Sequence, residues 1–171
     1  IDKIIDILLI AKYKVVLRPH PMSQKKSKKK IYEIDKQFSP NPNFILEQNI
    51  TNFDSLSQSN IMISDWSGIA LEFAFTFERP ILYVDVPKKI LNPDFSEILH
   101  TPIEESIRNQ IGIVICKSDI ESIPKKIEEL CNNTEVMRNQ IRKAREDTVF
   151  NIGKSNKIGA EQIIELLNQL K

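Results

Sequence analysis

Residues 61–85 read IMISDWSGIALEFAFTFERPILYVD, and this stretch decides the fold. An apolar run at residues 60–64 predicts a strand, and a polar turn follows it. Apolar side chains then recur at helical spacing over residues 67–77, which predicts a helix. Residues 80–85 form a second continuously apolar run. Strand, helix and strand in this order are typical of a parallel pair with both faces covered, because a parallel connection needs a crossover segment.

The same alternation extends over the whole chain. Runs rich in Ile, Val, Leu and Phe predict five strands, at residues 15–17, 43–47, 60–64, 80–85 and 112–116. Apolar periodicity predicts helices at residues 1–9, 51–58, 67–77, 119–131, 134–148 and 160–170. The sequence therefore predicts an α/β fold with a doubly wound parallel sheet of the Rossmann-like kind.

Length and composition predict a single domain spanning residues 1–171. A hydrophobic content of 41% is enough for a sizeable core. The first predicted element is a crossover helix with no strand before it, so we expect an excised C-terminal fragment of a longer two-domain chain. No apolar run approaches the roughly 18 to 20 residues that cross a bilayer, and we expect a cytoplasmic protein.

The charged residues and cysteines argue against two classes of binding. The 24 basic and 23 acidic residues nearly cancel, so the chain has no overall field that would attract nucleic acid. Cys116 and Cys131 lack a paired spacing and nearby histidines, and they support neither a disulfide framework nor a zinc site. We therefore expect a protein of a reducing compartment that uses no metal and no cofactor and binds its ligand through a local site.

The first candidate site is the run Arg18, Pro19, His20 and Pro21, which directly follows the strand predicted at residues 15–17. Doubly wound sheets bind ligands at the carboxyl ends of their strands. Arg18 could hold a phosphate through two hydrogen bonds, and His20 could donate to a phosphate oxygen or accept a proton. The structural alternative is that both side chains merely cap the loop.

The second candidate site joins a predicted strand to a predicted helix. It consists of Ser64, Asp65, Trp66, Ser67 and Gly68. Backbone amides at a helix start bind anions, and Ser67 with Gly68 would let a diphosphate come close. Glu72, one turn later, could accept hydrogen bonds from ribose hydroxyls. In the structural alternative, Asp65 or Ser67 caps the helix, Glu72 is a surface residue, and Trp66 only packs.

A lysine cluster follows the histidine loop and comprises Lys25, Lys26, Lys28, Lys29 and Lys30. A solvated mobile loop is the default interpretation of such a run. Contact with an anionic membrane surface is the functional alternative, because each lysine close to that surface adds to the attraction. His100 lies in a less regular stretch, and we assign it no role.

Four segments in the same order carry a family resemblance. Residues 17–21 (LRPHP) match an arginine, variable residue, histidine, proline signature, and residues 63–67 (ISDWS) resemble an isoleucine, threonine, aspartate, tyrosine, serine signature. Residues 79–83 (RPILY) are similar to the next strand. Asn151, Gly153 and Lys154 match the closing segment. The family is that of the CDP-glycerol glycerophosphotransferases, the teichoic-acid polymerases and primases with a GT-B architecture.

The resemblance implies a reaction and a set of roles. An acceptor hydroxyl attacks the β-phosphorus of CDP-glycerol, glycerol phosphate is transferred, and CMP leaves. The resemblance implies that His20 contacts the transferring phosphate or assists proton transfer. Arg18 would support the loop or neutralise charge, and Asp65 with Ser67 would orient the diphosphate or glycerol. The polymer or lipid-linked acceptor would bind through the N-terminal half.

Two other functions stay open at this point. Ser67 and Gly68 followed by Glu72 are also similar to the helix start of nucleotide-sugar 2-epimerases and GT-B glycosyltransferases, which would make the donor a nucleotide sugar. A non-catalytic nucleotide-binding or scaffold domain is the third reading. The presence of both Arg18 and His20 together with Asp65 argues against a scaffold.

Overall fold

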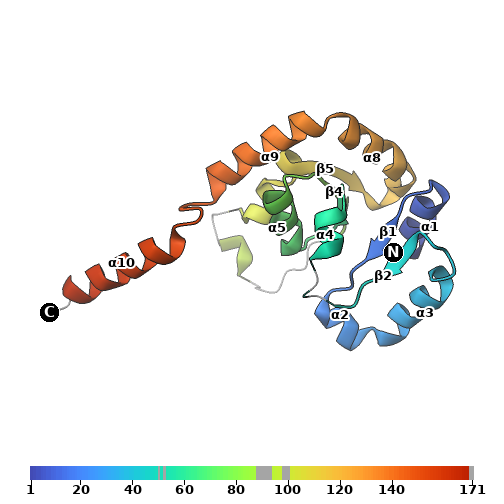
Figure 1. Ribbon diagram of the computed structural model, residues 1–171, viewed down its shortest axis with the longest axis horizontal. Helices are drawn as coiled ribbons and strands as arrows, with labels where there is room; N and C mark the ends of the chain where they lie inside the picture. The colour runs from blue at the N-terminus through green and yellow to red at the C-terminus, as the bar shows by residue number, and fades with distance from the viewer. Residues whose placement is uncertain (50, 52, 88–93, 98–100, 170–171) are drawn as a thin grey trace.

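Five short parallel strands form the centre of the described structure, which is a computed structural model (Figure 1). It describes residues 1–49, 51, 53–87, 94–97 and 101–169. The strands are β1 (Val15–Leu17), β2 (Phe44–Leu46), β3 (Met62–Ser64), β4 (Ile81–Asp85) and β5 (Gly112–Cys116). The predicted α/β class with parallel strands is therefore confirmed, and all five strands lie where the apolar runs place them.

Hydrogen bonds group these strands into two parallel sheets with a shared core. β1 pairs with β2, and β4 lies between β3 and β5. Val15 of β1 and Ile63 of β3 pack against the same buried cluster as Leu82 of β4. The two sheets therefore share one hydrophobic core, in keeping with a Rossmann-like arrangement.

Helices cover the strands on both faces. They are α1 (Asp2–Ile10), α2 (Pro21–Lys26), α3 (Lys28–Phe38), α4 (Asp54–Gln58), α5 (Gly68–Phe77), α6 (Ile103–Ser106), α7 (Arg108–Ile111), α8 (Ile123–Asn132), α9 (Thr134–Thr148) and α10 (Ser155–Gln169). Short 3-10 segments span Phe95–Glu97 and Lys117–Ser122. Figure 1 shows α5 and α9 beside the strands and α10 extending away from them.

Alternate side chains of β4 point into two different cores. Ile81 and Tyr83 are buried with side chains of α4, α5, α7 and α9. Leu82 and Val84 are buried with side chains of α1, α8 and β5. A strand that is apolar at every position needs a helical layer on each side, and these two clusters are those layers. A third, smaller cluster joins α1 and α3 to β2.

Three expectations need correction. The lysine run at residues 25–30 is not a loop, because it spans the end of α2 and the start of α3. Ile34 and Phe38 on α3 are buried, and this apolar stripe stabilises the helix against the core. The neighbouring lysines make the stripe hard to recognise in the sequence. The helix predicted at residues 119–131 starts only at Ile123, after a 3-10 segment, and the last helix starts at Ser155, before residue 160. His100 lies outside the described residues.

Helix α5 is tied to α9 at its C-terminal end. Glu78 follows α5 in the left-handed conformation and accepts hydrogen bonds from Arg142 and Arg145 of α9, at 2.8 and 3.1 Å. The hydrogen bond from Arg142 is the main cause that lowers the pKa of the Glu78 carboxyl. Arg145 also donates to the Phe75 carbonyl at 2.6 Å. These contacts fix α5 against α9.

We predict that Gly112→Ala disrupts the pairing of β4 with β5. A Cβ at residue 112 would lie 1.9 Å from the Ile81 carbonyl oxygen, so the backbone of one strand would have to move. We expect a loss of about 3 kcal/mol or more in unfolding free energy, measured by urea denaturation. Gly159→Ala on α10, where a Cβ meets nothing within 4 Å, is the control. It should be neutral or stabilising by up to about 1 kcal/mol, and equal effects of the two changes would contradict the prediction.

Candidate anion-binding site

The start of α5 places the first backbone amides of a helix at the carboxyl end of β3, and among them the Ala70 amide donates to the Ser67 carbonyl at 3.1 Å. Ser67 is the N-cap residue with an extended backbone, and its side chain makes no capping hydrogen bond. The first turn of α5 contains no acidic residue. The first amides of a helix have no partner within the helix, and the helix dipole makes this end attractive to an anion. The alternative in which the Ser67 hydroxyl caps the helix is therefore wrong.

The surface in front of this helix end is open. Asp65 and Gly68 are exposed, and Ser67 is half-buried. A Cβ added to Gly68 would meet nothing within 4 Å, so its backbone is accessible to a ligand. Asp65 and Ser67, which we expected to orient the diphosphate or glycerol, thus lie on one turn with Gly68, which we expected to let a diphosphate come close. Such a turn at a helix start is a common phosphate site.

A cluster behind this turn was not expected from the sequence. The Arg108 guanidinium carbon lies 3.9 Å from the centroid of the Trp66 ring and 4.7 Å from that of Tyr83. Arg108 Nη1 lies 2.9 Å from Asp85 Oδ1, and the Trp66 indole donates to the Val86 carbonyl at 2.8 Å. Trp66 is therefore a packing residue that connects the turn to the carboxyl end of β4.

Two members of this cluster, Arg108 and Tyr83, are buried. Arg108 is only 5% exposed, whereas the side chain of its partner Asp85 is 48% exposed. Burial raises the pKa of the Tyr83 hydroxyl to about 12, so Tyr83 is neutral at physiological pH. The cluster as a whole therefore presents one buried cation next to the α5 turn, balanced by one carboxylate at the surface.

Arg18 makes its contacts within the protein. Its Nη1 atom donates to Glu47 Oε2 at 2.9 Å and to the Ser55 hydroxyl at 3.1 Å, and Ser55 also donates to Glu47. Glu47 follows β2, and Ser55 belongs to α4. Arg18 thus ties the loop after β1 to the neighbouring strand and helix, as expected of a residue that supports the loop.

His20 is the N-cap of α2. The backbone amide of Met22 donates to His20 Nδ1 at 3.1 Å, and Pro21 occupies the first helical position. An amide nitrogen can only donate, so Nδ1 accepts, and in the neutral imidazole the proton lies on Nε2. His20 is exposed. Its imidazole can therefore present an N–H group to a ligand while it caps the helix.

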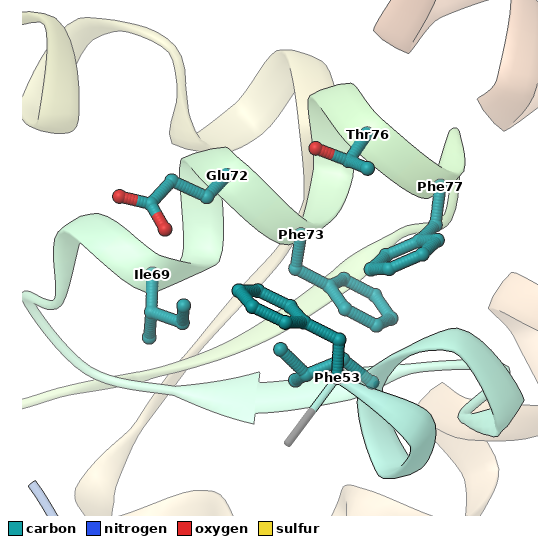
Figure 2. Close-up of a pocket in the computed structure, with 7 residues that line it drawn as sticks. Phe53, Ile69, Glu72, Phe73, Thr76 and Phe77 are labelled. Atoms are coloured by element: carbon teal, nitrogen blue, oxygen red, sulfur yellow. The ribbon is translucent and has the colours of Figure 1, made fainter. Parts of the chain in front are cut away.

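Glu72 lies at the rim of a small apolar pocket between α4 and α5. The pocket has a volume of about 180 Å³, and its lining consists of Phe53, Leu56, Ile69, Glu72, Phe73, Thr76 and Phe77. Figure 2 shows the three phenylalanine rings turned toward one another and the Glu72 carboxylate pointing away from them. The volume is below the roughly 300 to 1,000 Å³ of ordinary ligand pockets. The pocket alone is therefore too small for a nucleotide.

Helices α2 and α3 carry exposed lysines together with one exposed apolar side chain and one exposed amphipathic side chain. Lys25, Lys26, Lys28 and Lys29 are exposed, and Lys30 pairs with Asp2 of α1. Met22 and Tyr32 on the same two helices are 47% and 67% exposed. This surface, which we call the α2–α3 face, carries both positive charge and side chains that suit a membrane interface.

Comparisons with known proteins leave the family open. No protein-family model matches the chain, and neither do the curated proteins or the solved structures that were searched. Among the described residues, no group of three or more His, Cys, Asp or Glu side chains is placed to hold a metal ion. None of the described helices is long and apolar enough to cross a membrane.

Proposed function

We propose that this chain is the donor-binding half of a transferase that moves glycerol phosphate from CDP-glycerol to a hydroxyl acceptor in bacterial envelope polymer synthesis. The product would be a teichoic acid or a capsule. The observation that carries this proposal is the open start of α5, with exposed Asp65 and Gly68 and no capping side chain. It provides a site for the donor diphosphate at the carboxyl end of β3.

Phosphoryl transfer depends mainly on positioning and on stabilising charge. In this proposal the α5 amides hold the diphosphate and the Asp65 carboxylate accepts hydrogen bonds from the glycerol hydroxyls. His20 donates its Nε2 proton to the transferring phosphate, because the capping bond occupies Nδ1. The capping bond thus favours a phosphate contact over proton abstraction. Arg18 keeps the His20 loop in place through Glu47.

A second function is favoured by one observation. Glu72 is exposed one turn beyond the Ser67 and Gly68 start of α5, where a carboxylate can bind ribose. The same arrangement would serve a GT-B glycosyltransferase with a nucleotide-sugar donor. The two functions share the anion site and differ in the donor that they select.

We also propose a cytoplasmic protein that lies peripherally on the inner face of the cell membrane. The support is the α2–α3 face, where four exposed lysines accompany Met22 and Tyr32. Each lysine near an anionic surface contributes about 1 kcal/mol. This contact would hold the site close to a lipid-linked acceptor.

Calorimetric titration with CDP-glycerol, CMP, UDP and a UDP-sugar tests the donor. We expect selective binding of the cytidine ligands. Asp65→Ala should weaken CDP-glycerol binding about tenfold, because a charged hydrogen bond to the glycerol is lost, and should leave CMP binding unchanged. Asp147→Ala, an exposed aspartate on α9, is the control. Uridine-selective binding would support the glycosyltransferase instead. A chain that binds none of these ligands would refute both functions.

Two replacements of His20 in the complete protein separate helix capping from catalysis. His20→Ala removes the cap and should cost about 1 kcal/mol of stability, whereas His20→Asn keeps an acceptor for the Met22 amide. Both variants lose the Nε2 donor, so we expect transfer rates at least about 100-fold lower in each. Thermal melting and kcat are measured together. A His20→Asn protein with nearly full kcat would show that His20 is only a cap.

Vesicle sedimentation tests the membrane contact. We expect binding to vesicles that contain phosphatidylglycerol, little binding to pure phosphatidylcholine, and release at high salt. Replacing Lys28 and Lys29 by glutamine should weaken binding more than tenfold. The same change at Lys143 and Lys154, which are also exposed, should have little effect. Binding that ignores anionic lipid content would exclude this role of the α2–α3 face.

A further inference from the structure

Arg108 is a buried cation with unused hydrogen-bonding capacity. It is buried, and its Nε and Nη2 atoms have no hydrogen-bond partner. Its Nη1 atom alone pairs with Asp85, at 2.9 Å. Buried N–H groups without partners destabilise a fold, and a buried ion pair is often no better than apolar residues of equal volume. The contacts of the guanidinium with the Trp66 and Tyr83 rings offset part of this cost, but they leave Nε and Nη2 without hydrogen bonds.

The position of Arg108 next to the turn before α5 indicates what the guanidinium does. Its guanidinium contacts the ring of Trp66, the residue directly before the N-cap Ser67. The indole nitrogen of Trp66 is bonded to the Val86 carbonyl, so Trp66 is held at its ring face and at its edge. The turn that presents the α5 amides is thereby attached to the end of β4. A change at Arg108 would release one of these two attachments.

The charge of Arg108 also acts on the same turn. Tyr83, which is buried and neutral, covers the guanidinium from another side at 4.7 Å. Asp85 offsets part of this charge from the surface, where water screens the carboxylate, and the field that remains from the buried guanidinium would favour an anion bound at the start of α5. Arg108 thus acts on the anion site through its contact with Trp66 and through its charge, although the residue itself is buried.

We propose that Arg108 is a positioning residue of the α5 anion site: it holds Trp66 so that the amides after Ser67 converge on one phosphate group, and its buried charge strengthens the binding. The ligand class is a phosphate or diphosphate ester. The inference rests on the proposed function only for the nature of the ligand. Inorganic pyrophosphate serves as the probe for the phosphate-binding turn.

The test uses Trp66, the only tryptophan of the chain, as a fluorescent reporter. We expect pyrophosphate to change the Trp66 emission of the wild-type protein. Arg108→Met should keep the thermal midpoint equal or raise it, shift the emission of the free protein, and weaken pyrophosphate binding at least tenfold. Arg108→Lys keeps the charge but loses the planar contact, so its pyrophosphate affinity should lie between those of the wild type and Arg108→Met.

Arg145→Met is the matched control. Arg145 also has a buried Nε atom without a partner, but its bonds run to Phe75 and Glu78 at the other end of α5. This variant should lower the thermal midpoint and leave pyrophosphate affinity unchanged. Equal affinity of Arg108→Met and wild type would overturn the inference and leave the proposed function intact. A wild-type protein that binds neither pyrophosphate nor CDP-glycerol would refute both.

Asp85→Ala keeps the inference testable if Arg108→Met fails to fold. It removes the carboxylate that orients Arg108 at an exposed site, where substitution is tolerated. Loss of a negative charge alone would strengthen pyrophosphate binding, whereas loss of a positioned guanidinium weakens it. We expect about threefold weaker binding and an altered Trp66 emission. Stronger binding would overturn the positioning role.

Discussion

The whole arrangement depends on strand β4, because both hydrophobic cores are built on its alternate side chains. Ile81 and Tyr83 belong to one core, and Leu82 and Val84 belong to the other. The helices on each face therefore pack against the same five-residue strand. Its partner β5 comes so close at Gly112 that no side chain fits there. A shift of β4 would disturb both helical layers together.

The carboxyl end of β4 also positions residues of the candidate site. Asp85 is the last residue of the strand and orients Arg108, and the Val86 carbonyl that follows holds the Trp66 indole. The turn that opens α5 is thus aligned by the end of a strand whose own position is fixed by two cores. Rigid support of this kind suits a site that works by positioning a phosphate.

Most of the fold was predictable, because it depends on local patterns. Continuous apolar runs marked all five strands, and the Ser67 and Gly68 turn followed from its place between a strand and a helix. Helix α3 was missed because five nearby lysines outweigh the stripe that ends at Phe38. Arg108 was missed for a different reason. Its partner Asp85 is 23 positions away in the sequence, so no local pattern pairs the two residues.

Arg18 and Arg108 show why a motif alone does not define a binding residue. Arg18 belongs to the motif, yet its guanidinium bonds to Glu47 and Ser55, which neutralise its charge and occupy donors. Arg108 belongs to no motif, yet two of its nitrogens are unbonded beside an open helix start. Arg108 is buried, so in the proposed role it supports an anion site through Trp66 and through its charge and does not itself donate to the anion. On this argument Arg18 shapes the His20 loop, and under the proposed function the electrostatic attraction for a phosphate would come mainly from the start of α5 and from Arg108.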